Sequence, residues 1–284
     1  MAEAGRRGTE AGELPDLSPP FALSPSCTEE FRAKGHTVVR GLASRAEIEA
    51  YRPAIVETAL AFCREKRPLE ERETYFKAFL QITNLWERDP RVRAFVFARR
   101  FARVAAELLE VDGVRLYHDQ ALFKEPGGGY TPWHQDQNFW PLDTDRNITL
   151  WMPLVDVPSE VGSMTFGSGS HRLGNLGDLF ISDRSHAELE SRIRELGLAT
   201  ESHGALAAGD ATFHAGWTLH SAGPNPSAGM REVMTVIYFA DGTRVGAADH
   251  PVRAHDLAAW LRPCKPGELA AGALNPLLWS RTAG

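Results

Sequence analysis

The sequence of 284 residues has few cysteines, no long apolar run and no excess of basic residues, and each shortage argues against a class of protein. Its cysteines, Cys27, Cys63 and Cys264, lie far apart and form no CxxC pair, which disfavours a disulfide framework or a thiolate zinc site and suits a reducing cytoplasm. No apolar run approaches the ~20 residues needed to cross a bilayer. We therefore expect a cytoplasmic protein with no membrane partner.

The charge distribution argues against nucleic-acid binding. The net charge is −6, and no cluster of lysine and arginine offers a surface for phosphates. The first 20 residues contain two arginines but no apolar stretch after them, unlike a secretory signal. We predict a disordered tail over residues 1–20, a single domain over residues 21–284, and a small molecule as the partner, on a monomer or a homodimer.

The first part of the chain is typical of helices, and the second part is typical of strands. Ser44 and Glu47 have capping-box spacing, and the apolar residues that follow predict a helix over 45–65. Residues 91–109 predict one or two helices that close against a sheet. After Val114, short β-rich segments alternate with glycine and proline clusters, interrupted by a predicted helix over 185–197. We predict a mainly β fold with flanking helices, a double-stranded β-helix (jelly roll, cupin-like).

Residues 131–143, TPWHQDQNFWPLD, contain a candidate metal-binding pair, His134 and Asp136. A His-x-Asp pair is common by chance in a chain with 10 histidines. On a strand, however, residues i and i+2 face the same side, so both side chains could reach one ion. A third ligand could be His214 or His220, although either could be an ordinary half-buried histidine.

Arg231 helps to decide whether these histidines belong to a metal site. It follows His220 by 11 residues and opens an apolar strand, where a cation needs an anionic partner. That partner could be a structural Asp or Glu. Two imidazoles and one carboxylate form the facial triad of non-haem Fe(II) oxygenases, which leaves positions for a bidentate co-substrate and O2. The planar guanidinium suits a carboxylate of 2-oxoglutarate.

The motifs HDQALFKEPGGGYTPWHQDQNFWP, ITLWMPLVD, GSMTFGSGSH and LHSAGPN followed by Arg231 resemble those of the phytanoyl-CoA dioxygenase family, which includes ectoine hydroxylase. The resemblance covers roughly residues 30–245, with the motifs in the family's order. It implies a jelly roll that binds Fe(II) through His134, Asp136 and His220. Such an enzyme is a non-haem dioxygenase that uses O2 and 2-oxoglutarate to hydroxylate, or otherwise oxidise, a small organic metabolite, with release of succinate and CO2.

The resemblance also implies a co-substrate site. Arg231 would anchor 2-oxoglutarate, and Gln120 and Trp151 match family positions that line its site. Many members have a serine two residues after the distal histidine, where this chain has Ala222, with Ser221 one residue earlier. The serine contact therefore stays open.

Other features bear on the reaction and the substrate. Related halogenases carry a small residue at position 136, so a carboxylate there favours hydroxylation; desaturation and ring chemistry stay open. Aromatic residues near the proposed ligands could form a pocket for a hydrophobic or cyclic molecule, and Gln81 could belong to a lid. Alternatively, some of these aromatic residues fill the barrel. The candidate substrate residues are Trp133, Phe139, Trp140 and Gln81.

Two other classes of protein are compatible with the same residues. One is a metal-dependent hydrolase or isomerase on a cupin-like barrel, which would use the His/Asp/His set with zinc and would give Arg231 no role. The other is a non-catalytic β-barrel binding protein. The absence of a basic groove disfavours a substrate that carries coenzyme A.

Overall fold

The computed structural model describes residues 13–177 and 180–282. Two antiparallel sheets form its centre. The large sheet has the order β1-β8-β5-β10-β3-β11, with β2 also paired to β3, and the small sheet has the order β4-β9-β6-β7. The strands of the large sheet are β1 (His36–Val39), β2 (Leu80–Thr83), β3 (Gly113–Phe123), β5 (Asn147–Pro153), β8 (Ala211–Ala215), β10 (Val233–Ala240) and β11 (Leu277–Ser280). Those of the small sheet are β4 (Thr131–His134), β6 (Met164–Gly167), β7 (Thr200–Ser202) and β9 (His220–Ala222).

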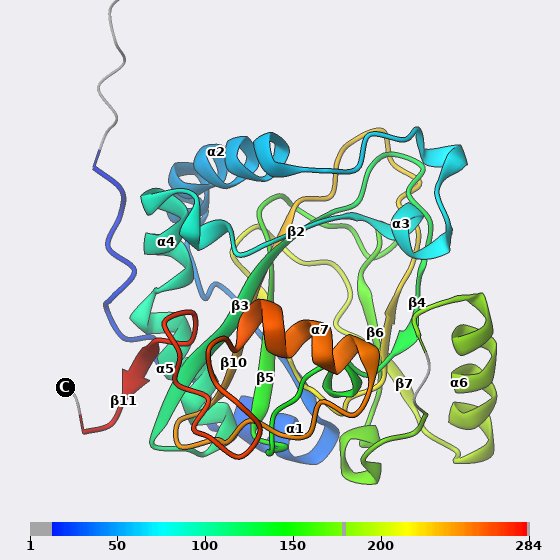
Figure 1. The fold of residues 1–284 in the computed structure, drawn as a ribbon. Helices are drawn as coiled ribbons and strands as arrows, with labels where there is room; N and C mark the ends of the chain where they lie inside the picture. Colours follow the sequence, from blue (N-terminus) through cyan, green and yellow to red (C-terminus); the bar gives the residue numbers. More distant parts are fainter. Residues whose placement is uncertain (1–12, 178–179, 283–284) are drawn as a thin grey trace, which may run out of the picture.

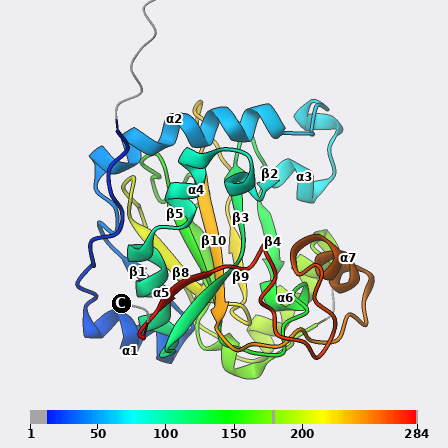
Figure 2. The ribbon, with the colours of Figure 1, turned by 60° about the vertical axis from the view of Figure 1, so that its left-hand side comes forward.

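Helices surround the two sheets. The helices are α1 (Pro25–Lys34), α2 (Arg45–Phe62), α3 (Thr74–Ala78), α4 (Pro90–Val96), α5 (Arg99–Leu109), α6 (Asp183–Glu195) and α7 (Pro251–Trp260). The short 3-10 turns are η1 (Leu69–Glu71), η2 (Leu85–Glu87), η3 (Asp136–Asn138) and η4 (Ser170–Leu173). Helix α5 packs on the outer side of the large sheet, and α6 packs on β4 (Figures 1 and 2). Helix α2 begins with the predicted capping box at Ser44 and ends three residues before the predicted boundary.

Alternating side chains in the large sheet separate the core from an internal cavity. In β5, Leu150 and Met152 belong to the main apolar core together with residues of α5, whereas Thr149 and Trp151 line the cavity. Met164 and His220 of the small sheet line the same cavity. The two sheets therefore face each other across the cavity, and the helix-covered side of the large sheet carries the main core.

A β-bulge in β3 changes which side chains face inward. In the pairing with β10, Ile237 lies opposite His118 and Tyr238 lies opposite Leu116, so Tyr117 is an extra residue. As a result, Tyr117 packs with Trp140 in an apolar cluster separate from the main core, and the adjacent His118 lines the cavity. Two consecutive residues thus contribute to the same side of the sheet.

The predicted disordered tail needs correction in its described part. Residues 1–12 lie outside the described residues. In contrast, Leu17 is buried at 3% exposure, and the carbonyl groups of Pro15 and Leu17 accept hydrogen bonds from Tyr51 Oη at 2.7 Å and Arg100 N at 3.2 Å. Leu17 provides an apolar anchor that the polar composition around it obscured. The division into a tail and one domain otherwise stays a prediction.

No helix among residues 13–177 and 180–282 is long and apolar enough to cross a membrane.

Candidate active site

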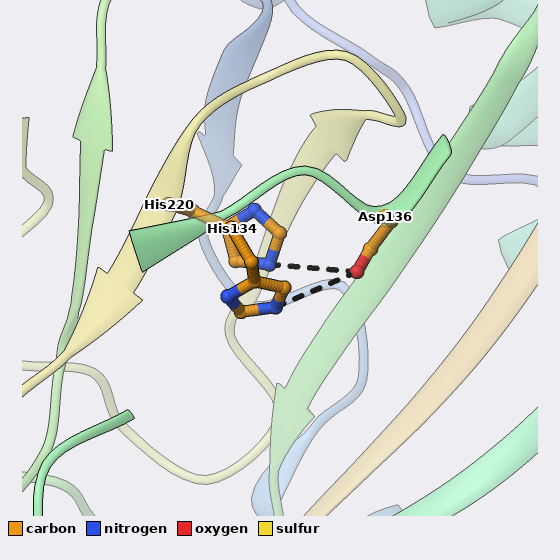
Figure 3. Close-up of side chains that lie close together, drawn as sticks. All are labelled: His134, Asp136 and His220. Atoms are coloured by element: carbon orange, nitrogen blue, oxygen red, sulfur yellow. Dashed lines mark ion pairs between the residues drawn. The ribbon is translucent and has the colours of Figure 1, made fainter. Parts of the chain in front are cut away.

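His134, Asp136 and His220 converge at one point between the sheets. His134 ends β4 and pairs with His220 at the start of β9. Their Nε2 atoms lie 3.6 Å and 3.7 Å from Oδ1 of Asp136 (Figure 3). One potential ligand atom from each residue lies within 4.8 Å of the others. The predicted strand geometry for Asp136 is wrong, because β4 ends at His134 and Asp136 begins the turn η3.

Backbone carbonyl groups fix the orientation of both imidazoles. Nδ1 of His134 lies 2.8 Å from Pro132 O, and Nδ1 of His220 lies 2.9 Å from Thr218 O. With Nδ1–H donating to these carbonyls, the Nε2 lone pairs point toward the cluster. Burial lowers the pKa of each histidine to about 4, so both imidazoles are neutral at neutral pH. Two neutral nitrogens and one carboxylate are a suitable donor set for a divalent transition metal.

His214, the alternative third ligand, contacts the other oxygen of Asp136. Its Nε2 lies 3.2 Å from Oδ2, and Thr149 donates to the same oxygen at 3.1 Å. Burial alone would raise the pKa of Asp136, but the neighbouring histidines His220, His214 and His134 hold it below its usual range. His214 and Thr149 therefore fix one carboxylate oxygen and leave Oδ1 facing the other two histidines.

The two glutamines beside Asp136 hold the turn in place. Gln135 is fully buried, and its Nε2 donates to Gly174 O at 2.9 Å and Trp217 O at 2.6 Å. Gln137 donates to Leu142 O at 3.4 Å and accepts a hydrogen bond from Asn147. These contacts connect the turn that carries Asp136 to three other segments.

Arg231 is buried without an acidic partner. It is 2% exposed, and its Nη1 donates to Gly162 O at 2.7 Å. Its guanidinium carbon lies 5.3 Å from the ring centre of Trp151. Within the described part of the chain, Nε has no hydrogen-bond partner and no carboxylate forms an ion pair with Arg231. Burial lowers its pKa to about 9, so it stays a cation at neutral pH.

Lys124, which the sequence reasoning missed, lies beside Arg231. The two residues exchange backbone hydrogen bonds of 2.9 Å in each direction, and Lys124 is fully buried. Its ammonium donates to Gly129 O and lies 3.5 Å from Oγ1 of Thr131. Burial, together with the nearby Arg231, lowers its pKa to about 6. The only sequence feature that could have indicated a role for Lys124 is its position at the end of the apolar strand in ALFKEPG.

Close packing around Gly162 leaves no room for a side chain beside Arg231 and Lys124. A Cβ at this position would lie 2.8 Å from Nη1 of Arg231 and 3.3 Å from Cδ of Lys124, and the φ of Gly162 is +63°. Thr131, whose hydroxyl faces Lys124, pairs with Ala222 across β4 and β9. Thr131 thus places a hydroxyl on the cavity wall opposite Ala222, the position at which many family members have a serine. Ser221 and Ala222 also line the cavity.

A cavity of about 590 Å³ joins these groups. It contains nearly all of the predicted site residues. The predicted residues that line it are His134, Asp136, His220, Arg231, Gln120, Trp151, Phe139, Trp140 and Gln81. Gln81 donates to Gln120 and accepts a hydrogen bond of 2.8 Å from Tyr75 Oη, so a polar chain runs along this wall.

The prediction that Trp133 contacts a substrate needs correction. Trp133 packs in an apolar cluster with Leu189 and Ile193 of α6. It precedes His134 on β4, so its side chain leaves the opposite face of the strand. His134 faces the cavity, and Trp133 consequently anchors α6 behind it.

The other end of the cavity contains residues that the sequence reasoning missed. Asp256 and Trp260 come from α7, and His118 comes from the bulge in β3. Further lining residues are Glu73, Tyr75, Phe76, Phe79, Phe180 and His255. No local motif marks these residues, because α3, α7 and β3 meet only in the folded chain.

Comparisons with known proteins are consistent with this geometry. The model of the phytanoyl-CoA dioxygenase family (PhyH) matches residues 31–233. A protein of Stutzerimonas stutzeri described as a probable alpha-ketoglutarate-dependent hypophosphite dioxygenase is 33% identical over 135 residues, which is 45% of this chain. The match spans 46%, about half, of that relative's length.

Two solved structures share the fold over most of the chain. The non-haem alpha-ketoglutarate-dependent carbocyclase SnoK from nogalamycin biosynthesis is 25% identical with a TM-score of 0.73, covering 92% of this chain and 99% of that one. The epimerase SnoN, solved with Fe3+, alpha-ketoglutarate and nogalamycin RO, is 25% identical with a TM-score of 0.71, covering 89% and 98%. These matches confirm the predicted jelly-roll fold.

Proposed function

Because the chain belongs to the phytanoyl-CoA dioxygenase family, as its motifs predicted, we propose that it is a non-haem Fe(II)- and 2-oxoglutarate-dependent dioxygenase that oxidises a small organic metabolite. The observation that carries this proposal is one shared cavity. It contains both the His134, Asp136 and His220 cluster and the buried Arg231, which has no ion-pair partner among the described residues. A metal site alone fits many activities. A metal site next to a buried cation fits a carboxylate co-substrate.

The residues fit both implied groups. Iron would be held by His134, Asp136 and His220, whose ligand atoms already converge. The distal carboxylate of 2-oxoglutarate would be held by Arg231, whose buried Nε has no partner among the described atoms. When bound, iron and 2-oxoglutarate would react with O2 to oxidise a substrate C–H bond, and succinate and CO2 would be released.

The protein's own contribution is orientation and charge. The carbonyls of Pro132 and Thr218 keep Nε2 of both histidines directed at the metal position. His214 and Thr149 hold the far oxygen of Asp136. In water Arg231 would bind a carboxylate weakly, but in this buried site the attraction is stronger because little solvent screens it.

The alternative functions explain less of the site. A zinc hydrolase or isomerase could use the same three ligands, but it gives the buried Arg231 no role. A non-catalytic binding protein gives no role to the orientation of the two histidines. Hypophosphite, named for the relative, is a small inorganic anion, whereas the far end of this cavity is aromatic and acidic. We therefore favour an organic substrate. The three unpaired cysteines support a cytoplasmic location.

A spectroscopic experiment tests this proposal. Anaerobic addition of Fe(II) and 2-oxoglutarate should produce a weak metal-to-ligand charge-transfer band in the visible, and His134→Ala should abolish it. His203→Gln is a matched control, because His203 contacts His36 away from the cavity, and it should keep the band. A wild-type protein without the band, or a band that persists in His134→Ala, would overturn the proposal.

A further inference from the structure

The two ends of the cavity carry opposite charge. Arg231 lies at the inner end, and it is the only arginine or lysine among the described lining residues. The outer end contains the carboxyl groups of Glu73 and Asp256 and the imidazoles of His118 and His255. Resting on the proposed function, we infer that this outer end binds an organic cation, so that the substrate carries an amine next to an apolar or cyclic part.

Asp256 is the main acidic group of this site. It is 9% exposed, and Tyr117 Oη donates to its Oδ2 at 2.9 Å. Burial raises the pKa of Asp256 to about 6, so the group is mostly ionised at neutral pH. No lysine or arginine in the described ranges forms an ion pair with it; Arg253 on the same helix pairs with Asp249 at 3.3 Å. The neighbouring His255 and a hydrogen bond from Trp260 stabilise the charged form but do not cancel the effect of burial, and a buried carboxylate is costly unless a cation accompanies it.

His118 gives an independent indication of a ligand. It is 5% exposed, lines the cavity, and its Nδ1 has no hydrogen-bond partner in the part of the chain that the structure describes. Burial lowers the pKa of His118 to about 4, so its ring is neutral and offers an acceptor nitrogen. The ring of Trp260 lies 5.3 Å from that of His118, which places α7 and the bulge of β3 on one wall. A ligand at this wall meets hydrogen-bond acceptors from two elements.

The aromatic walls add to the same preference. The faces of aromatic rings attract cations, and such rings often surround quaternary or protonated amines. Carboxylates and ring faces both favour a positive group and disfavour a negative one. The aromatic residues that line the cavity outside the co-substrate end are Tyr75, Phe76, Phe79, Phe139, Trp140, Phe180 and Trp260.

Helix α7 adds Asp256 and Trp260 to the outer end, beside Glu73 and His118 from earlier parts of the chain. The family model matches residues 31–233, whereas α7 covers Pro251–Trp260. The helix lies in front of the large sheet (Figure 1). The metal ligands and Arg231 lie in the matched region, and Asp256 and Trp260 lie outside it. The two α7 residues can therefore be changed without altering any of the proposed iron ligands or Arg231.

Binding of three matched probes tests the inference. The probes are 2-phenylethylamine, 2-phenylethanol and 3-phenylpropanoate, which share a ring and differ in charge. Their affinities are measured by calorimetry on the anaerobic protein loaded with Fe(II) and 2-oxoglutarate. The amine should bind about tenfold more tightly than the alcohol, as expected for a hydrogen bond to a charged group. The carboxylate should bind most weakly.

Variants assign the preference to the acidic groups. Asp256→Asn should remove most of the tenfold advantage of the amine and leave the alcohol unchanged. Glu73→Gln should reduce the advantage about threefold, because Glu73 is exposed and screened, and it cannot disturb the core. Asp249→Asn, at an exposed aspartate that precedes α7, is the matched control and should change nothing.

Several results would overturn the inference. These are equal affinity for amine and alcohol, no measurable binding of the amine, tightest binding of the carboxylate, or amine affinity that Asp256→Asn and Glu73→Gln both leave unchanged. The charge-transfer band, recorded on the same samples, separates the two proposals. If the band forms and the amine preference is absent, only the substrate inference fails; if the wild type shows no band, the proposed function fails.

Discussion

The inner and outer ends of the cavity differ in what each lacks. At the inner end, the buried cation Arg231 has no carboxylate, and at the outer end the buried carboxylate of Asp256 has no lysine or arginine, among the residues that the structure describes. Each end is therefore complementary to a ligand of opposite charge. The inner end comes from residues within the part that the family model matches, whereas the outer end combines Glu73 and His118 from that part with Asp256 and Trp260 of α7, beyond it. The groups for the reaction and the groups for substrate charge thus lie at different ends of one cavity.

The largest expected effect comes from the metal ligands between the two ends. Asp136→Asn keeps the shape of the side chain but removes the negative charge. It should lower Fe(II)-dependent succinate formation more than about 100-fold, because the loss of a direct ligand should exceed the 10- to 100-fold effect typical of residues that only contact a ligand. Asp145→Asn, at an exposed aspartate, is the control. Succinate formation above a tenth of the wild-type rate would contradict the assignment of Asp136.

Arg231→Gln should weaken the inner end alone. Loss of one partner of a buried charge pair costs about 2–5 kcal/mol, so the KM for 2-oxoglutarate should rise on the order of 100-fold. Fe(II) content, measured by metal analysis, should stay the same. Arg244→Gln, which removes an arginine bonded to Gly267 O, should leave the KM unchanged. An unchanged KM in Arg231→Gln would contradict the role of Arg231 in binding 2-oxoglutarate, and unchanged turnover in a variant without Arg231 would favour the hydrolase or isomerase.

His214→Gln should have an intermediate effect. His214 fixes the far oxygen of Asp136, and loss of such an outer partner typically reduces metal affinity about 10- to 100-fold. Fe(II) affinity, measured by competition with a chelator, should therefore fall while the KM for 2-oxoglutarate, at saturating iron, should not. If affinity is fully retained, the contact between His214 and Asp136 has no role in metal binding.

Two hydroxyl groups at the inner end can be compared directly. Thr131→Val should raise the KM for 2-oxoglutarate about tenfold, because a hydrogen bond to a carboxylate is lost. Ser221→Ala should raise it less than about threefold. The reverse order would show that Ser221, not Thr131, replaces the serine that position 222 lacks.

The last prediction concerns stability and its pH dependence. Lys124 has a pKa of about 6 in the folded state and about 10.4 in an unfolded chain. Between these values the unfolded chain binds more protons, so this lysine destabilises the fold near pH 7, and the cost disappears as pH rises toward 10. Lys124→Met should therefore raise the urea midpoint at pH 7, with a smaller gain at pH 9.5. An equal gain at both values would show that Lys124 titrates normally.

The sequence contained enough information to predict the inner end. His134, Asp136, His220 and Arg231 lie in motifs whose order and spacing are readable in one chain, and the structure brings all four to one cavity. The strand geometry assumed for Asp136 was nevertheless wrong, since the chain turns directly after His134. Alternation along β4 would also have indicated that Trp133 and His134 face opposite sides, and Trp133 does pack on α6.

The outer end could not be predicted in the same way. His118 faces the cavity because a bulge adds Tyr117 to β3, and the shift appears only in the pairing with β10. Asp256 and Trp260 reach the cavity because α7 docks on the sheet from a segment far along the chain. Such contacts depend on tertiary structure, and no spacing rule in the sequence encodes them.

Release of labelled CO2 from 2-oxoglutarate labelled at its C1 carboxylate tests the central claim most directly. The account predicts that aerobic wild-type protein releases the label only when Fe(II) is present, and that Asp136→Asn and Arg231→Gln both abolish the release at low 2-oxoglutarate concentration. Release that is independent of Fe(II), or release that Asp136→Asn and Arg231→Gln both leave unchanged, would contradict it.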